Sequence, residues 1–288
     1  MAKPGRAGDQ AGGGRKGRRR LIAHVGVQKT GTTSLQRHLQ RNVQALADRL
    51  VVLTPQEGTP MRPLGRAAIA YSLRPAPDTE DALRLAIGDV LDGIPDNGLP
   101  VLLSHENLAG AMPGNGGETR LYPALPRIAA LLAAQAKDFA VELVFYSRNM
   151  DRWRPSVWAQ AVRTDGYAET LESFLDQTAG LPGWGELARR LAEGLGADRV
   201  TRLRLEDEPD PLRPGALLLA HAGLSEAEIA ALQPLDAPSM ERLNPGSTEF
   251  LRRLNGLALN PHARDRVADL VARTQPLFNA DYRPAGTL

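Results

Sequence analysis

Residues 24–35 read HVGVQKTGTTSL and overlap the end of an apolar run at 21–27. Four residues separate Gly26 from Gly31, which is the glycine spacing of a phosphate-binding loop. Such a loop brings backbone amides at the start of the following helix close to an anion. The stretch therefore predicts a buried strand, an anion-binding loop and a helix, in that order.

The loop differs from an ATP- or GTP-binding loop in the position of its lysine. Nucleotide-triphosphate loops place a lysine and then a Ser or Thr directly after the second glycine. Here Thr32 and Thr33 occupy those places, and the lysine lies before the glycine, at Lys29. The order predicts a phosphate-bearing ligand other than Mg-ATP.

Strand and helix patterns alternate along the chain, which predicts an α/β fold. Apolar runs predict strands at 21–27, 50–53, 101–104, 140–147 and 199–205, the last near a sheet edge. Helical spacing predicts helices at 32–47, 79–91, 121–137, 150–163, 168–178, 184–195, 212–222, 226–232, 248–257 and 263–274. Residues 54–78 are rich in Pro, Gly and Arg and are expected to be irregular. We expect three layers, with a mostly parallel sheet between helices and a helical C-terminal portion.

Composition limits the class of protein. The 288 residues carry 35 basic and 33 acidic side chains and no cysteine, which excludes disulfides and thiolate metal sites. Residues 1–20 carry a net charge of +6, whereas the other residues sum to −4. Residues 1–20 are expected to form a disordered basic tail, followed by one domain over 21–288. No apolar run is long enough to cross a membrane and no export signal is visible, so a cytoplasmic location is expected. No clustered metal ligands are visible, and no metal is predicted.

A second anion site is expected after the strand at 140–147. Arg148 directly follows this strand, and Ser156 comes eight residues later in the next predicted helix. Ligands of open parallel sheets bind beyond the carboxyl ends of the strands. A guanidinium fork and a hydroxyl suit a phosphate, so Arg148 and Ser156 are expected to face the same ligand as the glycine loop.

With these two motifs the chain resembles the sulfotransferases that use 3′-phosphoadenosine-5′-phosphosulfate (PAPS), and within them the bacterial and carbohydrate-type branch. Their K-[ST]-G-[ST]-[ST] loop matches Lys29, Thr30, Gly31, Thr32 and Thr33, preceded by Gln28; their Arg–Ser pair matches Arg148 and Ser156. The resemblance implies a P-loop fold in which the loop binds the 5′-phosphosulfate. It also implies that Lys29 contacts the bridging oxygen and that Arg148 and Ser156 bind the 3′-phosphate.

Sulfuryl transfer to an alcohol needs a group that accepts the proton of the hydroxyl. The strand at 101–104 ends at Ser104-His105-Glu106-Asn107, at the sheet edge where such a group is expected. We expect Glu106 to be the base, with His105 as the second candidate. A histidine has a useful pKa without tuning, whereas the pKa of a glutamate must be raised by its surroundings.

The sequence as a whole predicts a sulfotransferase with PAPS as donor and no metal. The acceptor is expected to be a hydroxyl or amine of a small molecule or glycan, with the loops at 54–78 and 108–120 around it. A P-loop kinase and a nucleotide-binding module without activity are the alternatives. Specific binding to nucleic acid is not expected, and the sequence leaves the oligomeric state open.

Overall fold

The computed structural model describes residues 17–237 and 243–279. Five strands in these ranges form one sheet, and every neighbouring pair is parallel. They are β1 (Arg19–Val25), β2 (Val51–Leu53), β3 (Val101–His105), β4 (Phe139–Ser147) and β5 (Val200–Arg204), in the order β2-β3-β1-β4-β5. The predicted parallel α/β fold is confirmed, including the edge position of the last strand.

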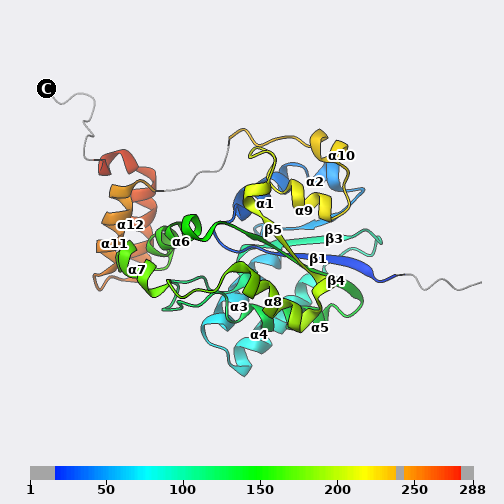
Figure 1. The fold of residues 1–288 in the computed structure, drawn as a ribbon, viewed down its shortest axis with the longest axis horizontal. Coiled ribbons are helices and arrows are strands. Elements are labelled where there is room, and N and C mark those ends of the chain that lie inside the picture. The colour runs from blue at the N-terminus through cyan, green and yellow to red at the C-terminus, as the bar shows by residue number, and fades with distance from the viewer. Residues whose placement is uncertain (1–16, 238–242, 280–288) are drawn as a thin grey trace, which may run out of the picture.

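Helices cover both faces of the sheet, as Figure 1 shows. One layer contains α1 (Thr32–Arg41), α2 (Val43–Leu46), α9 (Ala216–His221) and α10 (Glu226–Ala231). The other contains α3 (Met61–Leu73), α4 (Pro77–Asp92), α5 (Leu125–Gln135) and α8 (Trp184–Leu195). Successive strand residues point to opposite faces, so Leu21 and Ala23 pack in the second layer while Ile22 packs in the first.

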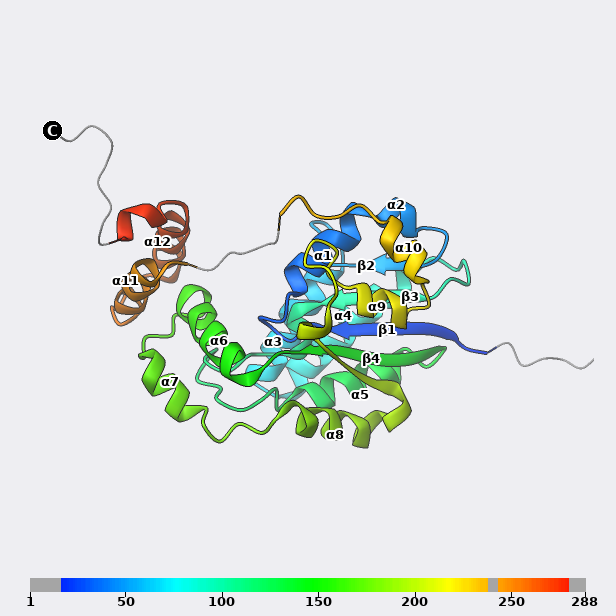
Figure 2. The same cartoon turned by 45° about the horizontal axis from the view of Figure 1, so that its top comes forward.

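A third group of helices gathers beyond the carboxyl ends of the strands (Figures 1 and 2). It consists of α6 (Met150–Thr164), α7 (Leu171–Gln177), α11 (Pro245–Asn255) and α12 (Pro261–Arg273). A small apolar cluster joins α11 and α12 to α6 through Val162, Leu251 and Val271. The predicted helical C-terminal portion is thus present, and it lies where ligands of parallel sheets bind.

Two expectations about local structure are wrong. The segment 54–78 is not irregular throughout, because Met61–Leu73 forms α3 and residues from Pro77 onward belong to α4. The first strand begins at Arg19 rather than at residue 21, and the Arg20 guanidinium pairs with Glu142 at 2.7 Å. Residues 1–16 of the predicted tail lie outside the described residues.

None of the described helices is both long and apolar enough to span a membrane. The cytoplasmic location and the single domain over 21–288 stay predictions.

Candidate active site

The loop between β1 and α1 needs glycine at two places. A Cβ atom on Gly26 would lie 2.7 Å from the Cα of Glu106, so no larger residue fits between β1 and β3. Gly31 caps α1 with a φ of 85°, a left-handed conformation that glycine adopts without strain. Lys29 also has a positive φ, 66°, which is uncommon for a residue with a side chain. The loop therefore needs glycine at positions 26 and 31, and the surrounding structure imposes the conformation of Lys29.

Gln28 ties the loop to three distant segments. Its side-chain amide donates to the carbonyl of Gly110 at 3.1 Å, and its side-chain oxygen accepts from the Tyr122 hydroxyl at 2.6 Å. The Gln28 backbone carbonyl accepts from the Trp153 indole at 2.8 Å. Tyr122 and Trp153 are themselves almost completely buried, so the loop rests on the core. The Gln28 side chain thus supports the loop, and its predicted part in ligand binding stays a prediction.

A pocket of about 820 Å³ opens beside the loop. Its walls come from five parts of the chain: the loop and start of α1, the residue after β3, the β4–α6 connection with α6, the residue after β5, and α12. They include the following predicted residues: Lys29, Gly31, Thr32, Thr33, Glu106, Arg148 and Ser156. Thr30 is not among them, and its buried hydroxyl donates to the Val27 carbonyl at 2.5 Å. Two motifs more than a hundred residues apart thus share one pocket.

Arg148 joins the two motifs directly. Its guanidinium donates to the backbone carbonyl of Lys29 and to the Ser156 hydroxyl, both at 3.3 Å. The Ser156 hydroxyl donates in turn to the Arg152 carbonyl one helical turn earlier, and Ser156 is 1% exposed. The guanidinium therefore lies between the glycine loop and α6, close enough for one ligand with two anionic groups to reach both.

Glu106 lies in this pocket with the charge of Lys29 nearby. It begins the short 3₁₀ helix η1 (Glu106–Ala109) that follows β3, and it is half-buried. Burial raises the pKa of its carboxyl, although the charge of Lys29 and a hydrogen bond from Thr33 partly oppose that rise. A carboxylate whose pKa is raised is a better proton acceptor than an exposed one.

His105 is placed differently. It is 4% exposed, and α3 packs so closely on it that a Cβ on Gly65 would lie 2.2 Å from its ring. Its Nδ1 accepts from the Asn107 amide at 3.1 Å, and burial lowers the pKa of the imidazole to about 4. His105 is not among the residues that line the pocket. The geometry thus separates the two predicted bases and leaves only Glu106 facing the pocket.

The sequence did not single out the outer wall of the pocket. It consists of Gln160, Arg163 and Thr164 on α6, Leu205 after β5, and Arg264, Asp265, Ala268 and Asp269 on α12. The α6 residues follow Ser156 at helical spacing and could have been found by extending that face of the helix. The α12 residues could not, because they depend on how α12 packs against α6. The Arg264 guanidinium donates to the Val162 carbonyl at 2.7 Å and so fixes this contact.

Among residues 17–237 and 243–279, no group of three or more His, Asp or Glu side chains is arranged to hold a metal ion. That the protein works without a metal stays a prediction.

Comparison with known proteins adds little beyond this geometry. No family model matches the chain, and no curated protein matches it. Among solved structures it is similar to a sulfotransferase from Alicyclobacillus acidocaldarius, with 17% identity and a TM-score of 0.46. The similarity covers 86% of this chain and 95% of that one. Because both values are low, this similarity assigns no activity to the chain.

Proposed function

We propose that this protein is a PAPS-dependent sulfotransferase that transfers a sulfuryl group to a hydroxyl or amine. One observation carries the proposal: the Lys29–Thr33 loop and the Arg148–Ser156 pair line one pocket, and Arg148 contacts both Lys29 and Ser156. PAPS carries a phosphosulfate and a separate 3′-phosphate on one adenosine. A pocket with two linked anion sites suits such a ligand.

The side chains of the pocket fit the donor chemically. Backbone amides at the start of α1, the Thr33 hydroxyl and the Lys29 ammonium are donors suited to the phosphosulfate. The Arg148 guanidinium and the Ser156 hydroxyl suit the 3′-phosphate, since a planar fork can donate two parallel hydrogen bonds to an oxyanion. We assign the second pair to discrimination against nucleotides without a 3′-phosphate.

The position of Glu106 supports the following reaction. The acceptor oxygen or nitrogen attacks sulfur, the bond from sulfur to the bridging phosphate oxygen breaks, and adenosine 3′,5′-bisphosphate leaves. The Glu106 carboxylate accepts the proton of the acceptor, and its raised pKa favours that step. Lys29 stabilises the negative charge that develops on the bridging oxygen. The transfer is direct, without a covalent intermediate on the protein.

The walls of the pocket support one class of acceptor over another. Apart from Leu205 and Ala268, the lining beyond the loop consists of polar or charged side chains, and it includes no aromatic ring. Hydroxyl-rich acceptors such as glycans or lipid-linked sugars suit such a surface better than flat phenols do. We therefore place the enzyme in the carbohydrate-type branch of its class.

Thermal unfolding separates this function from the two alternatives. Adenosine 3′,5′-bisphosphate at about 100 times its Kd should stabilise the protein by about 2.7 kcal/mol, whereas ATP with Mg²⁺ should not. The reverse order would indicate a kinase and would overturn the proposal. Stabilisation by the bisphosphate, without transfer of ³⁵S from PAPS to any member of a panel of mono- and oligosaccharides, lipid-linked sugars and amines, would indicate a binding module without activity.

A further inference from the structure

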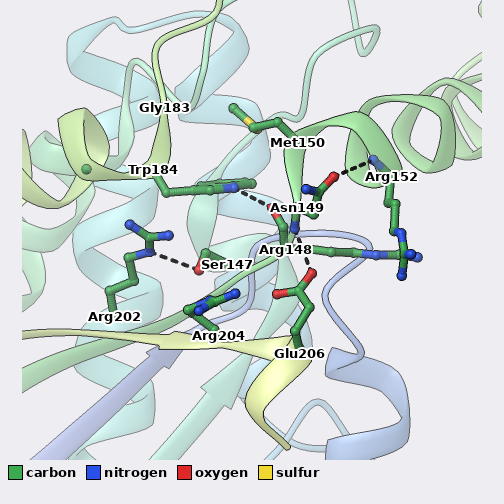
Figure 3. A pocket seen from close by; sticks show the side chains of 11 residues that line it. Ser147, Arg148, Asn149, Met150, Arg152, Gly183, Trp184, Arg202, Arg204 and Glu206 are labelled. Atoms are coloured by element: carbon green, nitrogen blue, oxygen red, sulfur yellow. Dashed lines mark hydrogen bonds between the residues drawn. The ribbon is translucent and has the colours of Figure 1, made fainter.

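A second pocket lies beside the first, on the other side of the β4–α6 connection. It has a volume of about 710 Å³ and is formed by the ends of β4 and β5, the start of α6 and the start of α8 (Figure 3). Four arginines line it: Arg148, Arg152, Arg202 and Arg204. Of the two pockets, only this one includes β5 and α8, and the two share only Arg148.

The charge of this pocket is not balanced by its own residues. Glu206 is the one carboxylate in the lining, and it accepts a hydrogen bond from the Asn149 amide at 2.7 Å. Asp207 lies 3.8 Å from Arg204, at the limit of an ion pair. Within the described part of the chain, no carboxylate lies within 4 Å of the Arg202 guanidinium, whereas Arg20, Arg84 and Arg252 each pair with a carboxylate. A guanidinium with no carboxylate nearby, such as that of Arg202, attracts anions.

The Arg202 side chain and the backbone of Arg148 are also held in place. The Arg202 Nε donates to the Ser147 hydroxyl at 2.9 Å, and this hydroxyl donates to the Leu203 carbonyl at 3.0 Å. Ser147 is 1% exposed, so this anchor is rigid, and it leaves the two terminal nitrogens of Arg202 for the pocket. On the opposite side, the Trp184 indole donates to the Arg148 carbonyl at 2.6 Å and fixes the β4–α6 connection, as Figure 3 shows.

We propose that this pocket binds a phosphate or sulfate monoester. Guanidinium forks match the oxygens of phosphate and sulfate groups, and these groups carry enough charge to offset several arginines. The volume falls in the range of sites for whole small molecules, so it leaves room for the organic part of an ester. Met150 offers apolar surface beside the arginines for that part. This site does not depend on the function proposed above.

Isothermal titration calorimetry with glucose 6-phosphate tests the site, with Arg202→Gln as the variant. The matched control is Arg199→Gln, which removes the same charge from an exposed position just before β5, outside both pockets. Arg202→Gln should weaken binding about tenfold, the loss expected for a charge-assisted hydrogen bond, while Arg199→Gln should change it less than about twofold. Arg204→Gln provides the same measurement if Arg202→Gln does not fold.

Two results would overturn the proposal. Equal weakening by Arg202→Gln and Arg199→Gln, or no binding to the unmodified protein, would rule out the site. Inorganic phosphate that binds as tightly as glucose 6-phosphate would rule out the ester, because the organic part would then make no contact. Loss of sulfuryl transfer from PAPS in the Lys29→Ala variant tests only the pocket beside the glycine loop. The two proposals can therefore fail separately.

Discussion

Lys29 combines an unusual backbone conformation with a charge at the centre of the proposed reaction. Its φ of 66° turns the chain between the Gln28 support and Gly31, and its carbonyl accepts from Arg148 at 3.3 Å. Conformations of this kind cost roughly 1–3 kcal/mol and persist where the surrounding structure enforces them. The backbone of Lys29 thus belongs to the framework of the site, while its ammonium can act on a ligand.

Replacing Lys29 with Met should lower kcat about 10²- to 10³-fold, because charge on the leaving oxygen develops mainly in the transition state. The Kd for adenosine 3′,5′-bisphosphate should change much less, about tenfold at most. Steady-state kinetics and calorimetry give the two values. Lys137→Met, at an exposed site outside both pockets, is the matched control. Unchanged turnover in Lys29→Met would contradict the assigned role.

Glu106 should control the acid side of the pH profile. Only its ionised form accepts a proton, and burial raises its pKa above the usual range of a carboxyl. The value of kcat/KM should therefore rise with pH through that raised pKa and then level off. Glu106→Gln should lower kcat by about 10²- to 10⁴-fold and remove this rise. Glu226→Gln, at an exposed position on α10 outside both pockets, should keep both the rate and the profile.

At the scale of elements, α3 shows how the active-site strand is supported. Its buried residues include Met61, Leu64, Ala68 and Tyr71, and their spacing places them on one side of the helix. Pro63 lies in the first turn, where a missing amide proton removes no helical hydrogen bond. Gly65 lets the helix approach the ring of His105. The helix thus packs directly on the end of β3, one residue before Glu106.

Gly65→Ala should therefore destabilise the protein by about 1–3 kcal/mol, since the added methyl group overlaps the His105 ring and forces both elements apart. Gly88→Ala in α4 is the control, because a Cβ there meets its nearest neighbour at 3.7 Å. The control should stabilise the protein by about 0.5–1 kcal/mol through helix propensity. Urea unfolding followed by circular dichroism measures both. Equal effects would contradict the close packing.

The sequence predicted the strands and most helices because buried parallel strands form continuous apolar runs and helices repeat every 3.6 residues. It missed α3 because Pro60, Pro63 and Gly65 suggest a loop, although two of them lie at the helix start and the third meets His105. It placed Lys29, Arg148 and Glu106 at strand ends, where parallel topology brings them together. It could not separate Glu106 from His105, because that depends on packing by α3.

At the scale of the whole molecule, buried polar groups connect the layers. His24 on β1 is completely buried, and its Nδ1 lies 2.8 Å from the Ser104 hydroxyl on β3. Gln36 on α1 donates to the Ser104 carbonyl at 3.2 Å, so the helix after the glycine loop is tied to the strand that ends at Glu106. The relative position of the two halves of the active site therefore depends on the core.

The two buried histidines His24 and His105 should make the stability of the protein depend on pH. Burial lowers the pKa of both His24 and His105 to about 4, below the value of about 6.5 in the unfolded chain. The unfolded state then binds more protons below pH 6.5, so stability falls as the pH drops from about 6.5 towards 4. Each histidine contributes on the order of 3 kcal/mol to this loss.

Urea unfolding at pH 7 and at pH 5 measures this dependence. His24→Asn keeps a side chain that can hydrogen-bond to Ser104 but cannot become charged in this range. The variant should lose less stability between the two pH values than the unmodified protein, whatever its stability at pH 7. An identical loss in both proteins would show that His24 does not titrate as described.

Gln28 has a consequence for the thermodynamics of ligand capture. A loop bound at one residue to the segments around Gly110, Tyr122 and Trp153 is already in one shape before any ligand arrives. Ligand binding then costs little conformational entropy of the backbone. More of the attraction between the anion and the backbone amides therefore contributes to the affinity. Such a rigid loop is selective because its hydrogen-bond donors cannot rearrange around an anion of a different shape.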